Sequence, residues 1–324
     1  MAESHIDPET IARFAADLDT LAPEAGTLGV AVSGGPDSLA LLLLAAATRP
    51  GKVEAATVDH ALRAESRAEA ERVAAMCKQL GVPHHILTAE WDVRPAANVQ
   101  ARARQMRYFL LDEWALRRGL PAVATGHHAD DQAETLLMRL ARGAGLSGLV
   151  GTRRRRLLDG GVHLVRPLLG WRRADLADIV AASGLTPVDD PTNRDPRHDR
   201  TRFRGLIDEA EWANVDRLAA SAAWLAEADE ALEWMTSALA TSRIAPDGDA
   251  LTLDALGLPR EIQRRLLLRG FDRLDAKRPR GPDLDRALHA LAAGKAATLS
   301  GLKLTGGNPW RLEHAPARRS HRPL

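Results

Sequence analysis

The feature that most constrains this chain is a short stretch, residues 28–38, with the sequence Leu-Gly-Val-Ala-Val-Ser-Gly-Gly-Pro-Asp-Ser. It reads as a buried strand that enters a glycine-rich turn, and an apolar helix follows over residues 39–47. A helix N-terminus presents unpaired N–H groups and the positive end of the helix dipole, and Gly34 and Gly35 let the backbone approach an anion closely. The stretch therefore predicts a phosphate site, to which its two serines add hydroxyl donors.

This phosphate loop lacks the lysine that follows the glycines in the nucleotide-binding loops of kinases and GTPases. Asp37 follows the glycines instead. A carboxylate beside a phosphate site is favourable chiefly when Mg²⁺ lies between the two groups. We therefore expect a bound triphosphate that is attacked at its α-phosphorus and releases pyrophosphate into the loop. The alternative interpretation is a turn that needs glycine only for its backbone angles.

Length and composition bound the class of protein. At 324 residues the chain is long enough for two domains of about 100–200 residues each. Its single cysteine, Cys77, excludes a disulfide framework or a cysteine-rich metal site within the chain, and its helical surroundings favour core packing. Residues 1–8 carry no signal-peptide pattern, and no apolar stretch approaches the ~20 residues that span a bilayer. We expect a cytoplasmic protein without membrane contact.

The formal net charge is only +1, but arginine far outnumbers lysine and gathers in clusters. Guanidinium groups match phosphate oxygens, so such clusters can follow a nucleic-acid backbone. Taken singly, each cluster is also explained as a solvated charged surface. The clusters lie at residues 102–107, 153–156, 194–204 and 318–322.

Strand and helix patterns alternate along the first two thirds of the chain. Beyond the phosphate loop, the predicted strands are 53–58, 85–88, 122–125 and 164–168, and the predicted helices are 66–80, 97–118, 130–142 and 172–183. This alternation predicts an α/β fold with a doubly wound, mainly parallel, Rossmann-like sheet. Its ligands are expected at the carboxyl ends of the strands.

The texture changes near residue 210. After a predicted loop over residues 187–196, the sequence becomes rich in alanine and leucine from about Trp212, with a long predicted helix over 215–240 and short strands around Leu251 and Leu299. We therefore expect a catalytic domain over residues 1–210. A smaller, mostly helical domain is expected over 211–324.

A second chemical signal lies at the end of the predicted strand 122–125. Asp131 and Glu134 stand three residues apart in the first turn of a helix, so their carboxylates share a face and could hold an ammonium group or a metal ion. Acidic residues also simply suit a helix N-terminus. The neighbouring His127 and His128 favour a site, although a closed zinc site would need four ligands that are not present.

Arg104 and Arg107 lie three residues apart in the predicted helix 97–118. Either could neutralise charge on a transferred phosphoryl group. The alternative is ion pairing with Asp112 or Glu113. Residues 190–193, Asp-Pro-Thr-Asn, read as a turn before a basic segment, and could order a loop over the site or merely connect two domains.

The motifs together resemble a known family. Residues 33–38 resemble the pyrophosphatase loop of the N-type ATP pyrophosphatases, the PP-loop superfamily. Joined to the remaining motifs, they resemble the tRNA(Ile)-lysidine synthetase family over residues 28–205. Those motifs are Val58-Asp59-His60, the helix with Arg104, Arg107 and Tyr108, the segment 126–134 with Leu136-Leu137 and Arg142-Gly143, and residues 190–193.

The resemblance implies that free lysine is attached to the wobble cytidine of the CAU anticodon of tRNA(Ile), through an adenylated cytidine, so that the codon read changes from AUG to AUA. It implies ATP and Mg²⁺ as cofactors and a second domain that docks tRNA, and it leaves a homodimer open. The implied ATP-binding residues are Ser33, Gly34, Gly35, Pro36, Asp37, Ser38, Asp59 and His60. The resemblance implies that Asp37 also binds Mg²⁺ and that Asp37, Arg104 and Arg107 are catalytic. It implies that Asp131 and Glu134 bind lysine, and that His127, His128 and Asp130 complete the site.

Two departures and three alternatives remain. The chain has Arg200-Thr201-Arg202 where the family commonly has Arg-Asn-Arg, and it resembles the compact members of the family. A tRNA thiolase of the same superfamily is opposed by the isolated Cys77. An amidating synthetase would lack the acid pair. A catalytically silent RNA-binding protein is opposed by Asp37, Asp131 and Glu134 together, because a pure binder gains little from carboxylates facing RNA phosphates.

Overall fold

The computed structural model describes residues 6–22, 26–63, 65–93, 97–188 and 199–316. The chain forms two compact units, Met1–Ala226 and Glu227–Leu324. The division falls inside helix α9 (Val215–Arg243), beyond the expected boundary near residue 210. The start of this helix belongs to the first unit because Val215 packs with Ala129 and Ala133 of the preceding domain.

The first unit is built on a six-stranded sheet with the order β3-β2-β1-β4-β6-β5. Every pair of neighbouring strands is parallel except β5 and β6, which are antiparallel. The strands are β1 (Leu28–Ala31), β2 (Val53–Asp59), β3 (His84–Thr88), β4 (Ala122–Thr125), β5 (Arg155–Leu157) and β6 (His163–Val165). The mainly parallel, doubly wound sheet confirms the predicted fold class.

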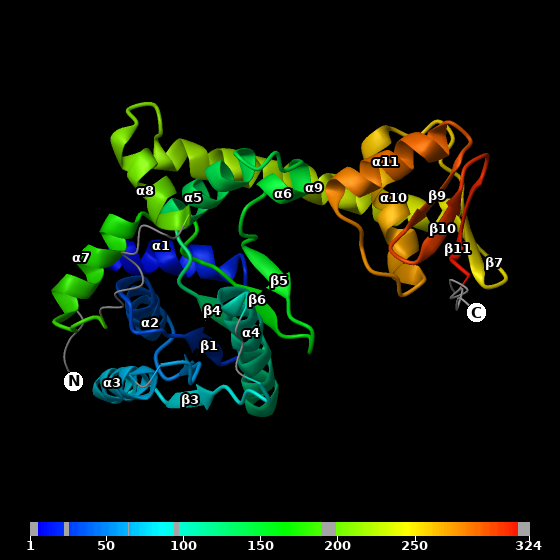
Figure 1. The fold of residues 1–324 in the computed structure, drawn as a ribbon. Coiled ribbons are helices and arrows are strands. Elements are labelled where there is room, and N and C mark those ends of the chain that lie inside the picture. Colours follow the sequence, from blue (N-terminus) through cyan, green and yellow to red (C-terminus); the bar gives the residue numbers. More distant parts are fainter. Residues whose placement is uncertain (1–5, 23–25, 64, 94–96, 189–198, 317–324) are drawn as a thin grey trace. The chain divides into compact units, whose positions relative to one another are not determined.

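Helices cover both faces of this sheet, and Figure 1 shows α2 and α4 on opposite sides of it. One core joins the strands to α1, α2, α3 and α7, and a second joins their other face to α4. The helices are α1 (Pro8–Asp19), α2 (Pro36–Thr48), α3 (Ser66–Gln79), α4 (Val99–Arg118), α5 (Ala129–Leu140), α6 (Leu146–Leu149), α7 (Arg173–Ser183) and α8 (Asp199–Glu209). In α2, residues 38–45 are all buried, which explains its nearly continuous apolar sequence.

The position of β1 fixes where a ligand binds. Leu28 of β1 pairs with Val53 of β2 on one side and with Ala122 of β4 on the other. From β1 the chain builds the sheet outward through β2 and β3, and then crosses back to place β4 on the other side of β1. The order of the strands therefore reverses between β1 and β4. Ligands of open α/β sheets bind in the crevice at such a reversal, outside the carboxyl ends of the strands.

The structure differs from the sequence-based expectation at a few boundaries. Helix α4 begins at Val99 and not at residue 97, because Asn98 has a positive φ of 52° that interrupts helical geometry. The last parallel strand is β6 (His163–Val165), shorter than the expected 164–168. Helices α1 and α8 and strand β5 were not expected. Most of the expected loop 187–196 lies outside the described residues.

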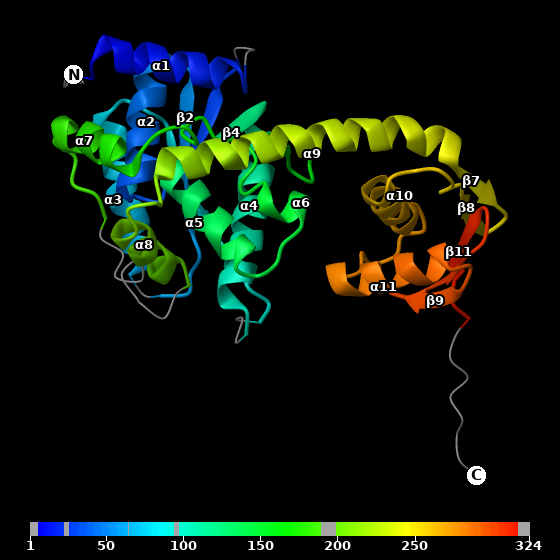
Figure 2. The same ribbon diagram turned by 90° about the horizontal axis from the view of Figure 1, so that it is seen from above.

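The second unit contains a five-stranded antiparallel sheet with the order β7-β8-β11-β10-β9. Helices α10 and α11 pack against it (Figure 2) around the buried Leu266, Phe271 and Trp310. The strands expected around Leu251 and Leu299 are β8 and β9. The elements are β7 (Ile244–Asp247), β8 (Ala250–Leu253), α10 (Arg260–Arg273), α11 (Gly281–Ala292), β9 (Ala296–Leu299), β10 (Leu302–Thr305) and β11 (Trp310–His314).

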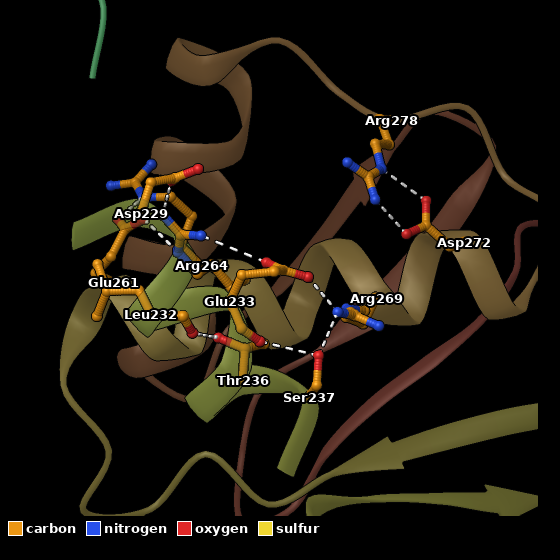
Figure 3. Close-up of polar contacts among 11 residues, drawn as sticks. Asp229, Leu232, Glu233, Thr236, Ser237, Glu261, Arg264, Arg269, Asp272 and Arg278 are labelled. Atoms are coloured by element: carbon orange, nitrogen blue, oxygen red, sulfur yellow. Dashed lines mark hydrogen bonds and ion pairs between the residues drawn. The ribbon is translucent and has the colours of Figure 1, made fainter. Parts of the chain in front are cut away.

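Ion pairs join α10 to the part of α9 that belongs to the second unit (Figure 3). The Nη2 of Arg265 lies 2.6 Å from Oδ1 of Asp229, and both side chains are buried. Arg265 also reaches Glu261 at 3.0 Å and Glu233 at 3.4 Å. Nearby, Arg269 pairs with Glu233 and donates to Oγ of Ser237 at 2.8 Å. In the described part of the chain, no helix is long and apolar enough to cross a membrane.

Candidate active site

The phosphate loop connects β1 to α2, and Gly34 is essential to its path. Gly34 has a φ of +89°, which favours glycine. A Cβ at this position would also lie only 2.8 Å from Cγ2 of Val188 and 2.9 Å from Cγ2 of Val73. Gly35 precedes the helix, and Pro36 occupies its first turn. The loop thus leads from β1 directly into the N-terminus of α2, which is the strand–loop–helix order that the sequence predicts.

Ser38 shapes the loop from inside. Its Oγ accepts a hydrogen bond from the backbone N–H of Ser33 at 3.1 Å and donates one to the carbonyl of Gly35 at 2.9 Å. The two serine hydroxyls are 3.2 Å apart. Because Ser38 is buried and Ser33 is exposed, Ser33 is the hydroxyl that is open to an anion.

The loop after β4 packs directly on the first turn of α2. A Cβ on Gly126 would lie 2.8 Å from the carbonyl oxygen of Asp37 and 3.1 Å from the backbone nitrogen of Ser38. These are backbone atoms that cannot rotate away. Glycine at this position therefore lets the two predicted motifs meet, and the sequence reasoning did not assign it this role.

His128 lies at the junction of the two motifs. Its Nε2 is 3.5 Å from Oδ2 of Asp37 and 3.7 Å from Oδ2 of Asp131, while its Nδ1 is 3.5 Å from Oδ2 of Asp130. Burial favours the neutral imidazole, but the contacts with Asp130 and Asp37 and the charge of Asp131 outweigh it and raise the pKa of His128 to about 10. His128 is therefore a buried cation held by three carboxylates.

Asp130 has a structural role. Its Oδ2 accepts the backbone N–H of Arg173 at 2.8 Å, at the start of α7, and lies 3.5 Å from Nε of Arg172. Burial opposes ionisation, but His128, the hydrogen bond from Arg173 and the charge of Arg172 together lower the pKa of this carboxyl. Asp130 thus joins α5 to α7 and orients His128.

The acid pair is brought together as predicted, but arginines from α8 contact it. The Nε of Arg204 lies 2.8 Å from Oε1 of Glu134, and Arg200 approaches both acids, with its Nε 3.5 Å from Oε2 of Glu134 and its Nη1 3.8 Å from Oδ1 of Asp131. Burial raises the pKa of Glu134, and the two arginines oppose that shift. Arg202 points elsewhere and approaches Asp199 at 4.0 Å.

The sequence carries a signal for these contacts in the spacing of the two arginines. Arg200 and Arg204 are four residues apart, so on a helix they share one face, as Asp131 and Glu134 do on theirs. Two faces of opposite charge on neighbouring helices predict ion pairing. The turn at residues 190–193 lies outside the described residues.

Asp37 has a carboxylate oxygen that is suited to binding Mg²⁺. Its Oδ1 is buried and has no hydrogen-bond partner among the described residues. No group of three or more His, Cys, Asp or Glu side chains suited to a metal ion occurs in that part of the chain. Mg²⁺ is commonly held by one or two carboxylates together with substrate phosphates and waters. A single carboxylate at the phosphate loop fits that mode of binding.

At the end of β2, Asp59 and His60 have different surroundings. Oδ1 of Asp59 accepts the backbone N–H of Ala61 at 2.9 Å and the hydroxyl of Ser66 at 2.6 Å, which stabilises the turn into α3. Burial, and then the charge of Arg107, lower the pKa of His60 to about 4. His60 is therefore neutral at physiological pH, with Arg107 close by.

Arginines also surround His127. Burial lowers its pKa to about 3; the charge of Asp131 raises the pKa, whereas those of Arg166 and Arg104 lower it further. Its Nδ1 is 3.0 Å from Oγ1 of Thr125. Arg166, just beyond β6, is 2% exposed and was not expected at the site. A lone arginine after a strand gave no pattern that would have revealed it.

The alternative role considered for the α4 arginines, ion pairing with nearby acids, is not observed. Neither Arg104 nor Arg107 pairs with a carboxylate within the described ranges. Asp112 is buried instead, and its Oδ2 accepts the backbone N–H of Gly160 at 2.6 Å. Cys77 is fully buried, as expected, and burial raises the pKa of its thiol to about 12.

Relatives of this chain share one name, and a family model matches much of its length. A family model described as a PP-loop domain matches residues 7–210. The tRNA(Ile)-lysidine synthase of Zymomonas mobilis is 45% identical over 301 residues, which cover 92% of this chain and 91% of that protein. The protein of the same name from Novosphingobium aromaticivorans is 48% identical over 314 residues, 96% of this chain and 95% of that protein.

Among solved structures, the U34-tRNA thiolase NcsA of Methanococcus maripaludis superposes with a TM-score of 0.53 at 17% identity, over 66% of this chain and 76% of that chain. A likeness at this identity shows the fold alone. The two curated relatives, by contrast, match along nearly their whole lengths. The chain, with its PP-loop domain and these relatives, belongs to the tRNA(Ile)-lysidine synthase family.

Proposed function

We propose that this chain catalyses the ATP-dependent ligation of free lysine to C2 of the wobble cytidine in the CAU anticodon of tRNA(Ile). The names of the relatives support the substrate. The observation that carries the proposal is the position of His128, whose Nε2 lies within 3.7 Å of a carboxylate oxygen of both Asp37 and Asp131. The imidazole of His128 thus lies between Asp37, which is expected at the phosphates, and Asp131, which is expected at the amino acid.

In the proposed first step, the cytosine O2 attacks the α-phosphorus of ATP, an O–P bond forms, and pyrophosphate leaves. The N–H groups at the start of α2 and the Ser33 hydroxyl bind the phosphates. Asp37, whose Oδ1 has no hydrogen-bond partner among the described residues, would hold Mg²⁺. When bound, Mg²⁺ supplies positive charge that stabilises the leaving pyrophosphate. Arg104 and Arg107 supply further positive charge on the α4 side of the site.

In the second step, the unprotonated lysine ε-amine attacks C2 of the adenylated cytidine and a C–N bond forms. The C2–O bond breaks, AMP departs with the former O2, and the proton lost by the amine passes to solvent. We assign Asp131 and Glu134 to the lysine ammonium group. Their shared face and the burial of Glu134 support this assignment, because a buried carboxylate binds a cation strongly once both are desolvated. His127, which is neutral, adds no repulsion to an incoming ammonium.

The remaining assignments follow the family. We propose that Asp59 and His60 form the end of the ATP site beside β2, where the neutral His60 can accept or donate a hydrogen bond to a nucleotide. We place the reaction in the cytoplasm and assign tRNA docking to residues 211–324, outside the PP-loop domain.

The test is lysine transfer to RNA. Purified protein is incubated with ATP, Mg²⁺, radiolabelled lysine and either tRNA(Ile) with a CAU anticodon or initiator methionine tRNA, and the label retained on RNA is counted. We expect lysine on tRNA(Ile) alone. AMP formation without retained label would contradict lysine as the nucleophile.

A thiolase activity is not favoured. Sulfur transfer of that kind usually depends on reactive cysteines, and this chain has only Cys77. That thiol is fully buried and its pKa is raised to about 12, so it forms almost no thiolate at neutral pH.

A further inference from the structure

A second pocket lies along the N-terminal half of α4, with a volume of about 670 Å³. Three arginines and three aromatic residues are prominent in its lining: Arg102, Arg104, Arg156, Trp91, Tyr108 and Phe109. None of these side chains has a role in the proposed chemistry except Arg104. The pocket thus combines positive charge with flat apolar surfaces.

The three arginines are available to an anion. Within the parts of the chain that are described, none of them pairs with a carboxylate, whereas most of the other arginines in those parts do. The guanidinium carbons of Arg104 and Arg156 lie 5.0 Å and 4.3 Å from the centre of the Tyr108 ring. Such cation–π contacts hold the charges in place without neutralising them.

Of the three aromatic residues, Phe109 is exposed, and Trp91 and Tyr108 are half-buried. Phe109 is 59% exposed, so its ring is open to stacking by a ligand that enters the pocket. Trp91 is held in place by the hydrogen bond from its Nε1 to the carbonyl of His60 at 2.8 Å. The acids in the lining do not cancel the charge, because Asp112 is buried and bonded to Gly160 and only Asp159 is exposed.

We propose that this pocket binds an unpaired nucleotide of the RNA substrate next to the modified cytidine, with its base against Phe109 and its phosphate at Arg102 or Arg156, the two lining arginines that the proposed chemistry does not use. Single-stranded RNA is recognised by stacking on aromatic side chains or guanidinium planes, with backbone phosphates at basic groups. The loop at residues 33–38 is assigned to the triphosphate of ATP. The pocket arginines are therefore available to a different phosphate, and the RNA backbone supplies one. The identity of the RNA rests on the proposed function.

The experiment measures binding of a labelled RNA hairpin that carries the CAU anticodon loop, by fluorescence anisotropy, at two salt concentrations. The variants are Phe109→Ala, Phe109→Tyr and Arg156→Gln. Leu116→Ala and Arg117→Gln are the matched controls, because both residues are exposed on α4 and neither lines the pocket. The apparent KM for ATP is measured for each variant, and thermal unfolding confirms that each is folded.

We expect Phe109→Ala to weaken hairpin binding about tenfold and Phe109→Tyr to bind as the wild type does. Arg156→Gln should reduce the slope of log affinity against log salt concentration by about 0.7, the value for one lost phosphate contact in single-stranded RNA. The controls should bind as the wild type does, and the KM for ATP should not change. Hairpin affinity unchanged in Phe109→Ala and Arg156→Gln would overturn the proposal. A raised KM for ATP with unchanged hairpin binding would also overturn it, and would assign the pocket to ATP.

The two proposals fail in different ways. If the wild type transfers no lysine but hairpin binding still depends on Phe109 and Arg156, the pocket stands and the proposed function falls. If lysine is transferred and the variants bind the hairpin normally, only the pocket assignment falls. Equal loss of binding to a fully base-paired hairpin would also overturn it, because a paired base cannot enter the pocket.

Discussion

The Nε of Arg204 lies 2.8 Å from Oε1 of Glu134, whose side chain is only 1% exposed. The acid assigned to lysine is therefore already paired with a cation of the protein. Burial raises the pKa of Glu134, and the hydrogen bond and charge of Arg204 oppose that shift. Arg204 keeps Glu134 closer to the ionised form that an ammonium group requires.

Replacing Arg204 by Gln should raise the KM for lysine severalfold at neutral pH, because loss of the guanidinium leaves a smaller share of Glu134 in the ionised form that binds an ammonium group. The pKa of Glu134 would rise further, so the carboxylate would be lost as the pH falls through that raised value. At higher pH the KM should return toward that of the wild type. Steady-state kinetics across neutral pH measure this.

Arg202→Gln is the matched control, because Arg202 lies on the same helix and, of the carboxylates in the described ranges, approaches Asp199 alone, at 4.0 Å. It should leave the KM for lysine unchanged. A KM for lysine that falls in Arg204→Gln would contradict this account, and would mean that the arginine competes with lysine for Glu134.

Gly126→Ala should disrupt the ATP site. The new methyl would meet the carbonyl oxygen of Asp37 at 2.8 Å and the backbone nitrogen of Ser38 at 3.1 Å, so the first turn of α2 must shift. Overpacking of this kind costs about 1–3 kcal/mol. We expect a lower melting temperature and a KM for ATP raised at least severalfold. Gly170→Ala, where a Cβ meets nothing within 4 Å, is the control and should change neither.

Asp37→Asn should abolish most of the pyrophosphate release while preserving the fold. The amide keeps the shape of the side chain but loses the charge that favours Mg²⁺, and we expect a loss of about a hundredfold or more. Raising the Mg²⁺ concentration should recover part of the rate. Asp130→Asn is the informative comparison, because Asp130 joins α5 to α7: it should lower the melting temperature and leave the Mg²⁺ dependence as it is. The same Mg²⁺ dependence in Asp37→Asn as in the wild type would rule out Asp37 as the ligand.

In the second unit, Arg265→Leu should cost about 3–5 kcal/mol in the free energy of unfolding, because Asp229 would remain buried without its guanidinium partner. Replacing both residues by Leu should recover most of that loss. Urea unfolding of the full chain, followed by far-UV circular dichroism, gives both values. A double variant as unstable as Arg265→Leu would show that the loss of stability does not come from the buried charge of Asp229.

Much of the fold could be predicted because its core is strongly patterned. Strand β4 has the expected bounds, Ala122–Thr125, and all of its residues are buried. Strand β5 is the opposite case: residues 155–157 are all exposed, so no alternation marks them as a strand, and only pairing with β6 forms it. Helix α1 does carry a sequence signal: Asp7 stands at its N-cap, where its side chain accepts the N–H of Thr10 at 3.2 Å, and Pro8 follows in the first turn.

The candidate site could be predicted where short-range spacing carries the chemistry. The loop at residues 33–38 and the pair Asp131 and Glu134 are of this kind. Contacts between distant segments could not be predicted, because no local pattern encodes them. Arg166 beside His127 and the close approach of Gly126 to α2 depend on which strands are neighbours in the sheet.

Tyr108 is the sole tyrosine of the chain, and two guanidinium groups lie over its ring. Protein produced with fluorotyrosine would therefore carry a single fluorinated side chain, placed beside the pocket along α4. A ligand that draws either guanidinium away changes the electric field at that nucleus. One resonance in a fluorine NMR spectrum thus reports the occupancy of this corner of the molecule, while Phe109, Arg102 and Arg156 stay unchanged.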